Sequence, residues 1–138
     1  MITERLQRYD NGEITAMKER DELTGRIIAC CYEVHTKLGP GFVERIYLNA
    51  LKISLEEQKI NFESEKELAV LFKDKNVGKF RIDLLIEGKV IVELKSVIGN
   101  PPKLFEAQVV SYLKASGLKV GLLVNFGGRK CQIRRLML

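Results

Sequence analysis

One stretch of the sequence limits the possible folds more than any other. Residues 118–126 (LKVGLLVNF) are strongly apolar and are followed directly by two glycines. A strand that is apolar on both faces has to be covered on both sides, and in proteins that cover is supplied by helices packed on a sheet. The chain is therefore expected to form an α/β domain with this strand near the centre of its sheet.

The rest of the sequence supplies the remaining layers. Apolar periodicity and breaks at Gly and Pro predict two helices, three strands, a third helix and two more strands. The expected ranges are helices at 22–38, 42–58 and 102–116, and strands at 60–72, 79–86, 89–96, 118–126 and 130–136. Gly127 and Gly128 are expected to form a tight hairpin turn. The predicted fold is thus α/β, with helices packed on a mixed sheet.

Length and composition indicate one domain of an ordinary kind. With 138 residues, we expect a polar arm or short helix at 1–20 and a single domain at 21–138. No apolar run reaches the ~18 residues of a membrane span, and the N-terminus lacks the apolar core of a signal peptide, so a cytoplasmic protein without membrane contact is expected. Three cysteines without a CxxC pair favour neither a disulfide framework nor a zinc site. The single histidine, His35, is expected to make a structural hydrogen bond.

Positive charge is concentrated toward the end of the chain. The net charge is +5, and no acidic residue follows Glu106. The basic residues beyond that point are Lys114, Lys119, Arg129, Lys130, Arg134 and Arg135. A one-sided basic region suits a polyanion such as nucleic acid. The alternative is a solvated basic surface that is balanced by acidic residues elsewhere.

Two polar residues interrupt apolar helix faces. In the helix at 42–58, Glu44 falls among the apolar positions, which are Val43, Tyr47, Ala50, Leu51 and Leu55. A carboxylate that faces a core has to be paired, bound to metal or protonated; the alternative is that it reaches water at the edge of the face. In the helix at 102–116, Gln108 lies one turn from Tyr112 on the apolar face. Gln108 either contributes to a site or is a buried amide bonded to backbone.

Neighbouring strands carry a third group of polar residues. Glu93 and Lys95 are two apart and project from one strand face, and Asp83 lies on the preceding strand. Two carboxylates beside an ammonium group make a candidate divalent-cation site; the alternative is a solvated face with a Glu–Lys pair. A three-residue loop at 87–89 would pair Ile86 with Val90 and bring Asp83 opposite Glu93, whereas a two-residue turn would not, so we predict the longer loop or a bulge. On the strand that carries Asp83, regular alternation places four apolar residues on the face opposite to Asp83: Phe80, Ile82, Leu84 and Ile86.

Several motifs occur in an order that matches a known family. Residues 41–47 read GFVERIY, a fit to GxxExxY, directly after VHTKLGPG at 34–41. Further along the chain are FRIDLL at 80–85, VELK at 92–95, QVVSYL at 108–113 and GLLVNFG at 121–127. Over roughly residues 22–136 the chain resembles the GxxExxY family of the PD-(D/E)XK nuclease superfamily. One departure is the GNPP segment at 99–102, which replaces a more polar opening of the following helix.

The resemblance implies the αβββαβ core of that superfamily. It also implies that Glu44, Asp83, Glu93 and Lys95 converge in the fold, with Gln108 nearby. These are the same residues that interrupt apolar surfaces or share a strand face in this sequence.

The expected function is Mg²⁺-dependent hydrolysis of phosphodiester bonds in nucleic acid, either DNA or RNA, with Mn²⁺ as an alternative cation. Asp83 and Glu93 would hold the cation, and Glu44 would be a direct or water-mediated ligand. Lys95 would stabilise charge on the phosphate or act as a base, and Gln108 would position it. The alternatives are a non-catalytic nucleic-acid-binding module and a protein-interaction subunit. A second copy of the chain is a further candidate partner, because a small core often needs help to grip a duplex.

Overall fold

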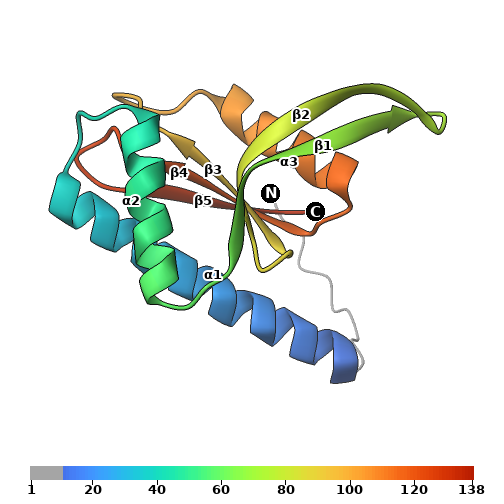
Figure 1. The fold of residues 1–138 in the computed structure, drawn as a ribbon, viewed down its shortest axis with the longest axis horizontal. Coiled ribbons are helices and arrows are strands. Elements are labelled where there is room, and N and C mark those ends of the chain that lie inside the picture. Colours follow the sequence, from blue (N-terminus) through green and yellow to red (C-terminus); the bar gives the residue numbers. More distant parts are fainter. Residues whose placement is uncertain (1–10) are drawn as a thin grey trace.

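The computed structural model describes residues 11–138, and side chains from residue 21 onward. The elements are α1 (Asn11–Leu38), α2 (Glu44–Glu57), β1 (Phe62–Phe72), β2 (Lys75–Ile86), β3 (Val90–Lys95), α3 (Lys103–Ser116), β4 (Val120–Asn125) and β5 (Gln132–Met137). The predicted order of helices and strands is confirmed (Figure 1). No helix in this part of the chain is long and apolar enough to cross a membrane.

The five strands form one mixed sheet in the order β1-β2-β3-β4-β5. All neighbours are antiparallel except β3 and β4, which run parallel and are joined by α3. Every residue of β4 is buried, as its apolar sequence predicts. A parallel pair needs a crossover connection, and α3 supplies it.

Helices cover both faces of the sheet. Residues of α1 and α2 pack with one set of strand residues, while α3 packs with a second set on the other face (Figure 1). The approach of α3 to β4 depends on Gly121, because a Cβ atom there would lie 2.6 Å from Cγ1 of Val109. The sheet is therefore a middle layer, with an apolar core on each side.

Two predicted boundaries differ from the structure at the N-terminal end. Helix α1 begins at Asn11 rather than at residue 22, so it runs through the expected boundary at residue 20; residues 1–10 lie outside the described range. Helix α2 begins at Glu44, and Val43 is its N-cap, with two thirds of its side chain exposed. The assignment of Val43 to the apolar face was wrong, because its backbone is extended rather than helical.

The tight turn predicted at Gly127 and Gly128 is also wrong. Strands β4 and β5 pair as far as Asn125 and Gln132, so residues 126–131 form a longer loop. The amide of Asn125 organises this loop: its Oδ1 accepts from the backbone of Gly127 at 3.1 Å, and its Nδ2 donates to Oε1 of Gln132 at 2.8 Å. These hydrogen bonds to the side chain of Asn125 replace the backbone bonds by which a short turn would continue the pairing of β4 with β5.

The β1–β2 hairpin is the longest pair of strands and projects beyond the rest of the sheet (Figure 1). Regular alternation fails in the part of β2 nearest the core. Leu84 and Ile86 pack on the α1–α2 side, but Ile82 and Leu85 pack on the α3 side. The prediction that Phe80, Ile82, Leu84 and Ile86 share a face was therefore wrong, and the change of face occurs at Asp83.

Candidate active site

Asp83 lies where β2 leaves its regular pairing with β3. The predicted three-residue loop is confirmed, since Ile86 pairs with Val90, but the ladder ends one residue before Asp83. Side chains continue the connection: Oε1 of Glu93 accepts from the backbone nitrogen of Asp83 at 2.9 Å, and Oδ2 of Asp83 accepts from that of Leu94 at 2.8 Å. The two carboxylates therefore bridge the strands at the point where backbone bonds stop.

The two carboxylates are costly to ionise in this position. Glu93 is 5 % exposed, and burial, followed by the nearby charge of Asp83, raises its pKa to about 8. Burial also raises the pKa of Asp83, although the bond from Leu94 and the charge of Lys95 oppose the rise. The pair thus favours holding a proton, or a cation that replaces it.

Helix α3 holds the ammonium group of Lys95. Nζ of Lys95 donates to Oε1 of Gln108 at 3.4 Å and lies 4.3 Å from the ring centroid of Phe105. An ammonium over an aromatic face is attracted by the ring quadrupole. Sequence reasoning missed Phe105 as part of the site, although its position three residues before Gln108 places the two side chains on one helix face.

Glu44 is the first residue of α2 and is exposed rather than buried in the core. Partial burial raises its pKa, the charge of Lys95 lowers it, and the charge of Asp83 raises it again. Glu44 and Asp83 line a common hollow of about 220 Å³. The structure therefore puts Glu44 at the solvent edge of the site.

The sequence profile of the PD-(D/E)XK nuclease superfamily matches residues 21–136. The chain belongs to this superfamily. The crystal structure of SSO0001 has a similar fold, with a TM-score of 0.54 and 22 % sequence identity. That likeness covers 67 % of this chain, which in turn spans 48 % of SSO0001, and it concerns the fold alone. No curated protein matches the sequence.

Superfamily members are typically metal-dependent, so the donor set has to fit a metal ion. Asp83 and Glu93 each use one oxygen for a backbone bond, and no described side chain has a fully buried polar atom without a partner, so each second oxygen still touches solvent. Carboxylate oxygens suit Mg²⁺, which commonly takes one or two carboxylates together with substrate phosphate. From residue 21 on, however, no three Asp, Glu, His or Cys side chains gather closely enough to form a complete cage. The residues fit a two-carboxylate site, and the role of Glu44 as a ligand stays a prediction.

Two loops beside the site are fixed by side-chain contacts. The hydroxyl of Tyr47 donates to the carbonyl of Gly39 at 2.5 Å, and its ring stacks on Phe126 at 4.7 Å. Nε2 of His35 bonds to the carbonyl of Gly128 at 2.8 Å, so the structural role expected for this histidine is confirmed. These contacts join the end of α1 and the start of α2 to the loop after β4.

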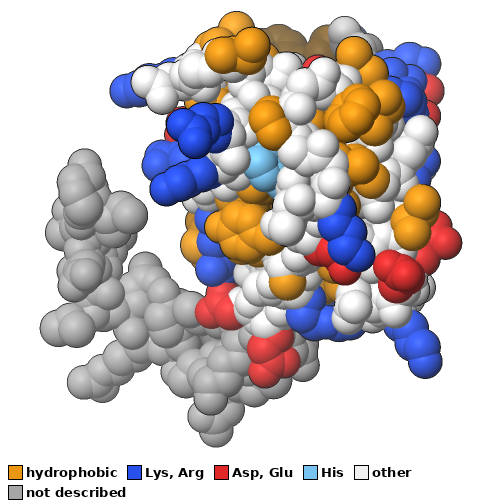
Figure 2. Space-filling view, turned by 90° about the vertical axis from the view of Figure 1, so that its left-hand side faces the viewer, with side chains coloured by type: hydrophobic (Ala, Val, Ile, Leu, Met, Phe, Trp, Pro, Cys, Tyr) orange, Lys and Arg blue, Asp and Glu red, His pale blue; other side chains and the backbone are white. Residues whose placement is uncertain are grey.

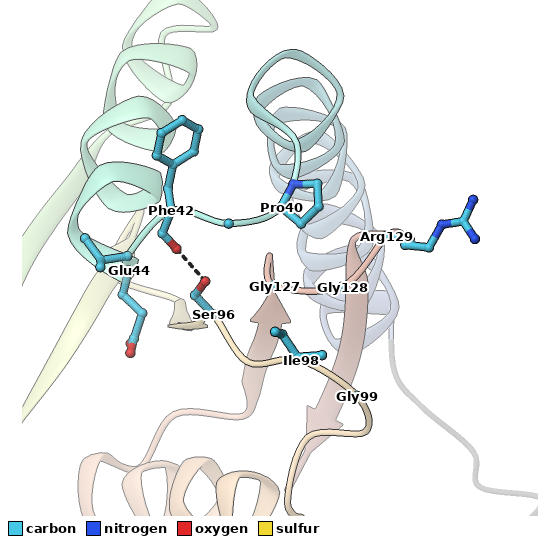
Figure 3. A pocket seen from close by; sticks show the side chains of 11 residues that line it. Pro40, Phe42, Glu44, Ser96, Ile98, Gly99, Gly127, Gly128 and Arg129 are labelled. Atoms are coloured by element: carbon cyan, nitrogen blue, oxygen red, sulfur yellow. Dashed lines mark hydrogen bonds between the residues drawn. The ribbon is translucent and has the colours of Figure 1, made fainter.

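A larger cavity of about 760 Å³ lies between these loops (Figure 3). Its walls come from the segment before α2, the segment after β3 and the loop after β4. Oγ of Ser96 donates to the carbonyl of Phe42 at 2.6 Å across one wall (Figure 3). Sequence reasoning missed this cavity, because its lining comes from three loops that are far apart in the chain.

Proposed function

We propose that the chain hydrolyses phosphodiester bonds in nucleic acid with the help of a divalent cation, as a GxxExxY-type member of its superfamily. The observation that supports this most directly is the pair of carboxylates, Asp83 and Glu93, which bridge two strands and each keep an oxygen in contact with solvent. Buried carboxylates are rarely kept together without a purpose, because each one raises the cost of ionising the other.

In this proposal Asp83 and Glu93 hold Mg²⁺, and Glu44 completes the set directly or through water. When bound, the cation would polarise the phosphate and lower the pKa of a coordinated water. Hydrolysis adds water across a P–O bond, so that one product keeps the phosphate and the other ends in a hydroxyl group. During this step negative charge builds up on the phosphate oxygens.

Lys95 is the residue best placed to stabilise that charge. Phe105 and Gln108 restrain its ammonium group, so it does not need to reorganise during the reaction. The positive charge of Lys95 lowers the pKa of both Glu93 and Asp83, which supports a common role for the three groups. Gln108 is a positioning residue here, since it acts through Lys95.

Calorimetry tests the metal site directly. Wild-type protein should bind Mg²⁺ or Mn²⁺, and the double variant Asp83→Ala/Glu93→Ala should not. A matched double variant at two exposed acids, Glu57→Ala/Glu63→Ala, should bind as wild type does. Metal-dependent cleavage of labelled oligonucleotides should follow the same pattern. Absence of binding in wild type, even with an oligonucleotide present, would refute the proposal.

A second candidate function, protein interaction, is favoured by the tip of the β1–β2 hairpin. Leu71, Phe72 and Val77 are each more than 60 % exposed there, and grouped exposed apolar side chains often mark interfaces. Light scattering over a range of concentrations tests whether the partner is a second copy. A mass that rises with concentration and returns to that of a monomer in Phe72→Ser would support self-association, whereas a constant monomer mass would exclude it.

A further inference from the structure

The two cavities and the basic loop form a row along one end of the molecule. Glu44 lines both the hollow that contains Asp83 and the larger cavity of about 760 Å³. Figure 3 shows Glu44 and Arg129 at opposite ends of the larger cavity. Arg129 also lines the next hollow, together with Lys130. A bound chain could therefore run from the carboxylates, through the larger cavity, to the basic loop.

Charged side chains lie at both ends of this row. The hollow at the catalytic end contains Glu44, Glu65 and Asp83 together with Arg45 and Arg81, and its carboxylates suit a cation that in turn holds a phosphate. Arg129 and Lys130 at the far end are exposed and suit a further phosphate. Figure 2 shows this side of the molecule, where Lys and Arg side chains group beside exposed hydrophobic ones and acidic side chains lie mostly in the lower half.

The middle of the row is apolar and has an aromatic side chain. Phe42 and Ile98 line it, and both are exposed, Ile98 to 95 %. The ring of Phe42 is held by an edge contact with Tyr47 at 6.1 Å, and the Phe42 carbonyl by Ser96. An added Cβ atom at Gly41 would meet nothing within 4 Å, so this wall faces open space. Figure 3 draws this ring pointing away from Ser96 and Ile98, at the edge of the cavity. A fixed and exposed aromatic ring there is a stacking surface for a base at the mouth of the cavity.

A base can reach such a cavity only when it is not paired inside a duplex. In double-stranded nucleic acid the bases are stacked within the helix and the phosphates lie outside, so enzymes that need a base in a pocket act on single strands or extrude the base. A cavity of about 760 Å³ is within the size range of small-ligand sites. Backbone contacts alone would not require it.

We infer that the cavity lined by Phe42 and Ile98 holds an unpaired nucleotide next to the scissile phosphate, and that Arg129 and Lys130 bind the phosphate beyond it. The substrate class is therefore nucleic acid with an unpaired segment rather than continuous duplex. This inference rests on the proposed function for the position of the scissile phosphate. The cavity adds a preference for unpaired nucleic acid, which the carboxylate site alone does not supply.

Fluorescence anisotropy tests the inference without requiring hydrolysis. A labelled single strand and the blunt duplex of the same sequence are titrated with protein in EDTA, as DNA and as RNA. Wild type should bind the single strand more tightly. Phe42→Ala should weaken single-strand binding by about 5- to 150-fold, the usual effect of losing one base–aromatic stack, and leave duplex binding unchanged. Tyr32→Ala removes an exposed ring on α1 and should change neither.

A second variant protects the test against misfolding. Ile98→Glu replaces an almost fully exposed side chain and puts a negative charge in the cavity, so it should weaken single-strand binding while the thermal unfolding midpoint stays that of wild type. Ile53→Glu, an exposed apolar-to-acid change on α2, is its control.

The possible results distinguish the inference about the unpaired nucleotide from the proposed catalytic function. Equal or tighter binding of duplex, or Phe42→Ala and Ile98→Glu behaving as their controls do, would overturn the inference even if metal-dependent cleavage is found. A single-strand preference that depends on Phe42, without any cleavage, would sustain the inference and refute the proposed catalysis. No binding to any of these nucleic acids would overturn both.

Discussion

Replacing Glu93 by glutamine should stabilise the protein and remove most of the dependence of its stability on pH. Burial raises the pKa of Glu93 from 4.5 to about 8. Between about pH 4.5 and 8, the folded protein therefore keeps a proton that the unfolded chain releases. The free energy of unfolding is highest below about pH 4.5 and falls as the pH rises through about 8. The full change corresponds to roughly 4 to 5 kcal/mol, at about 1.4 kcal/mol per pH unit. A glutamine carries no charge to bury, and its Oε1 can still accept from the backbone of Asp83.

The assay is urea unfolding followed by circular dichroism in EDTA, at a series of pH values from about 5 to 9. The curves of free energy against pH for wild type and Glu93→Gln should meet near the acid end and separate as the pH rises. Glu57→Gln, at an exposed position near the end of α2, should follow wild type throughout. A wild-type curve that is flat over this range, or a constant offset between the two proteins, would refute the reasoning.

Three further changes test the packing around the site. Asn125→Ala removes four hydrogen bonds and leaves buried partners unpaired, so the free energy of unfolding should fall by about 2 to 4 kcal/mol in urea titrations. Gly121→Ala should cost about 1 to 3 kcal/mol, because its Cβ would lie 2.6 Å from Cγ1 of Val109; Val109→Ala in the same chain should recover part of the loss in a double-mutant cycle. Gln108→Ala should lower kcat of metal-dependent cleavage by up to ~100-fold, because Lys95 loses its restraint, with unchanged calorimetric affinity for Mg²⁺.

Much of the fold could be predicted because apolar patterning and loop length are local properties. The order of elements follows from where the periodicity changes and where Gly and Pro interrupt it. The pairing of Ile86 with Val90 follows from requiring that Asp83 and Glu93 meet, since a shift of one residue reverses the faces of a strand. In both cases the information lies within a short stretch of the sequence.

The features that could not be predicted depend on contacts between distant segments. The change of face in β2 at Asp83 arises because side chains, rather than backbone groups, bond to the neighbouring strand. A prediction from regular alternation assumes backbone pairing along the whole strand, so it misses this change. The restraint of Lys95 by Phe105 requires α3 to cross a particular part of the sheet. The position of Glu44 at the solvent edge depends on where α2 begins, and the N-cap residue Val43 makes no side-chain capping bond that would mark this start in the sequence.

The topology of the sheet has a consequence for how this site forms during folding. Strands β1, β2 and β3 follow one another in the chain, so the hairpin that carries Asp83 and Glu93 needs only nearby residues. The parallel pairing of β3 with β4 needs α3 in place first, and such long-range pairings form slowly. We therefore expect the two acids to meet while still hydrated and to be dehydrated in a late docking step. Because ionised carboxylates oppose that step, refolding should be slower at pH values above the pKa of Glu93 than below it.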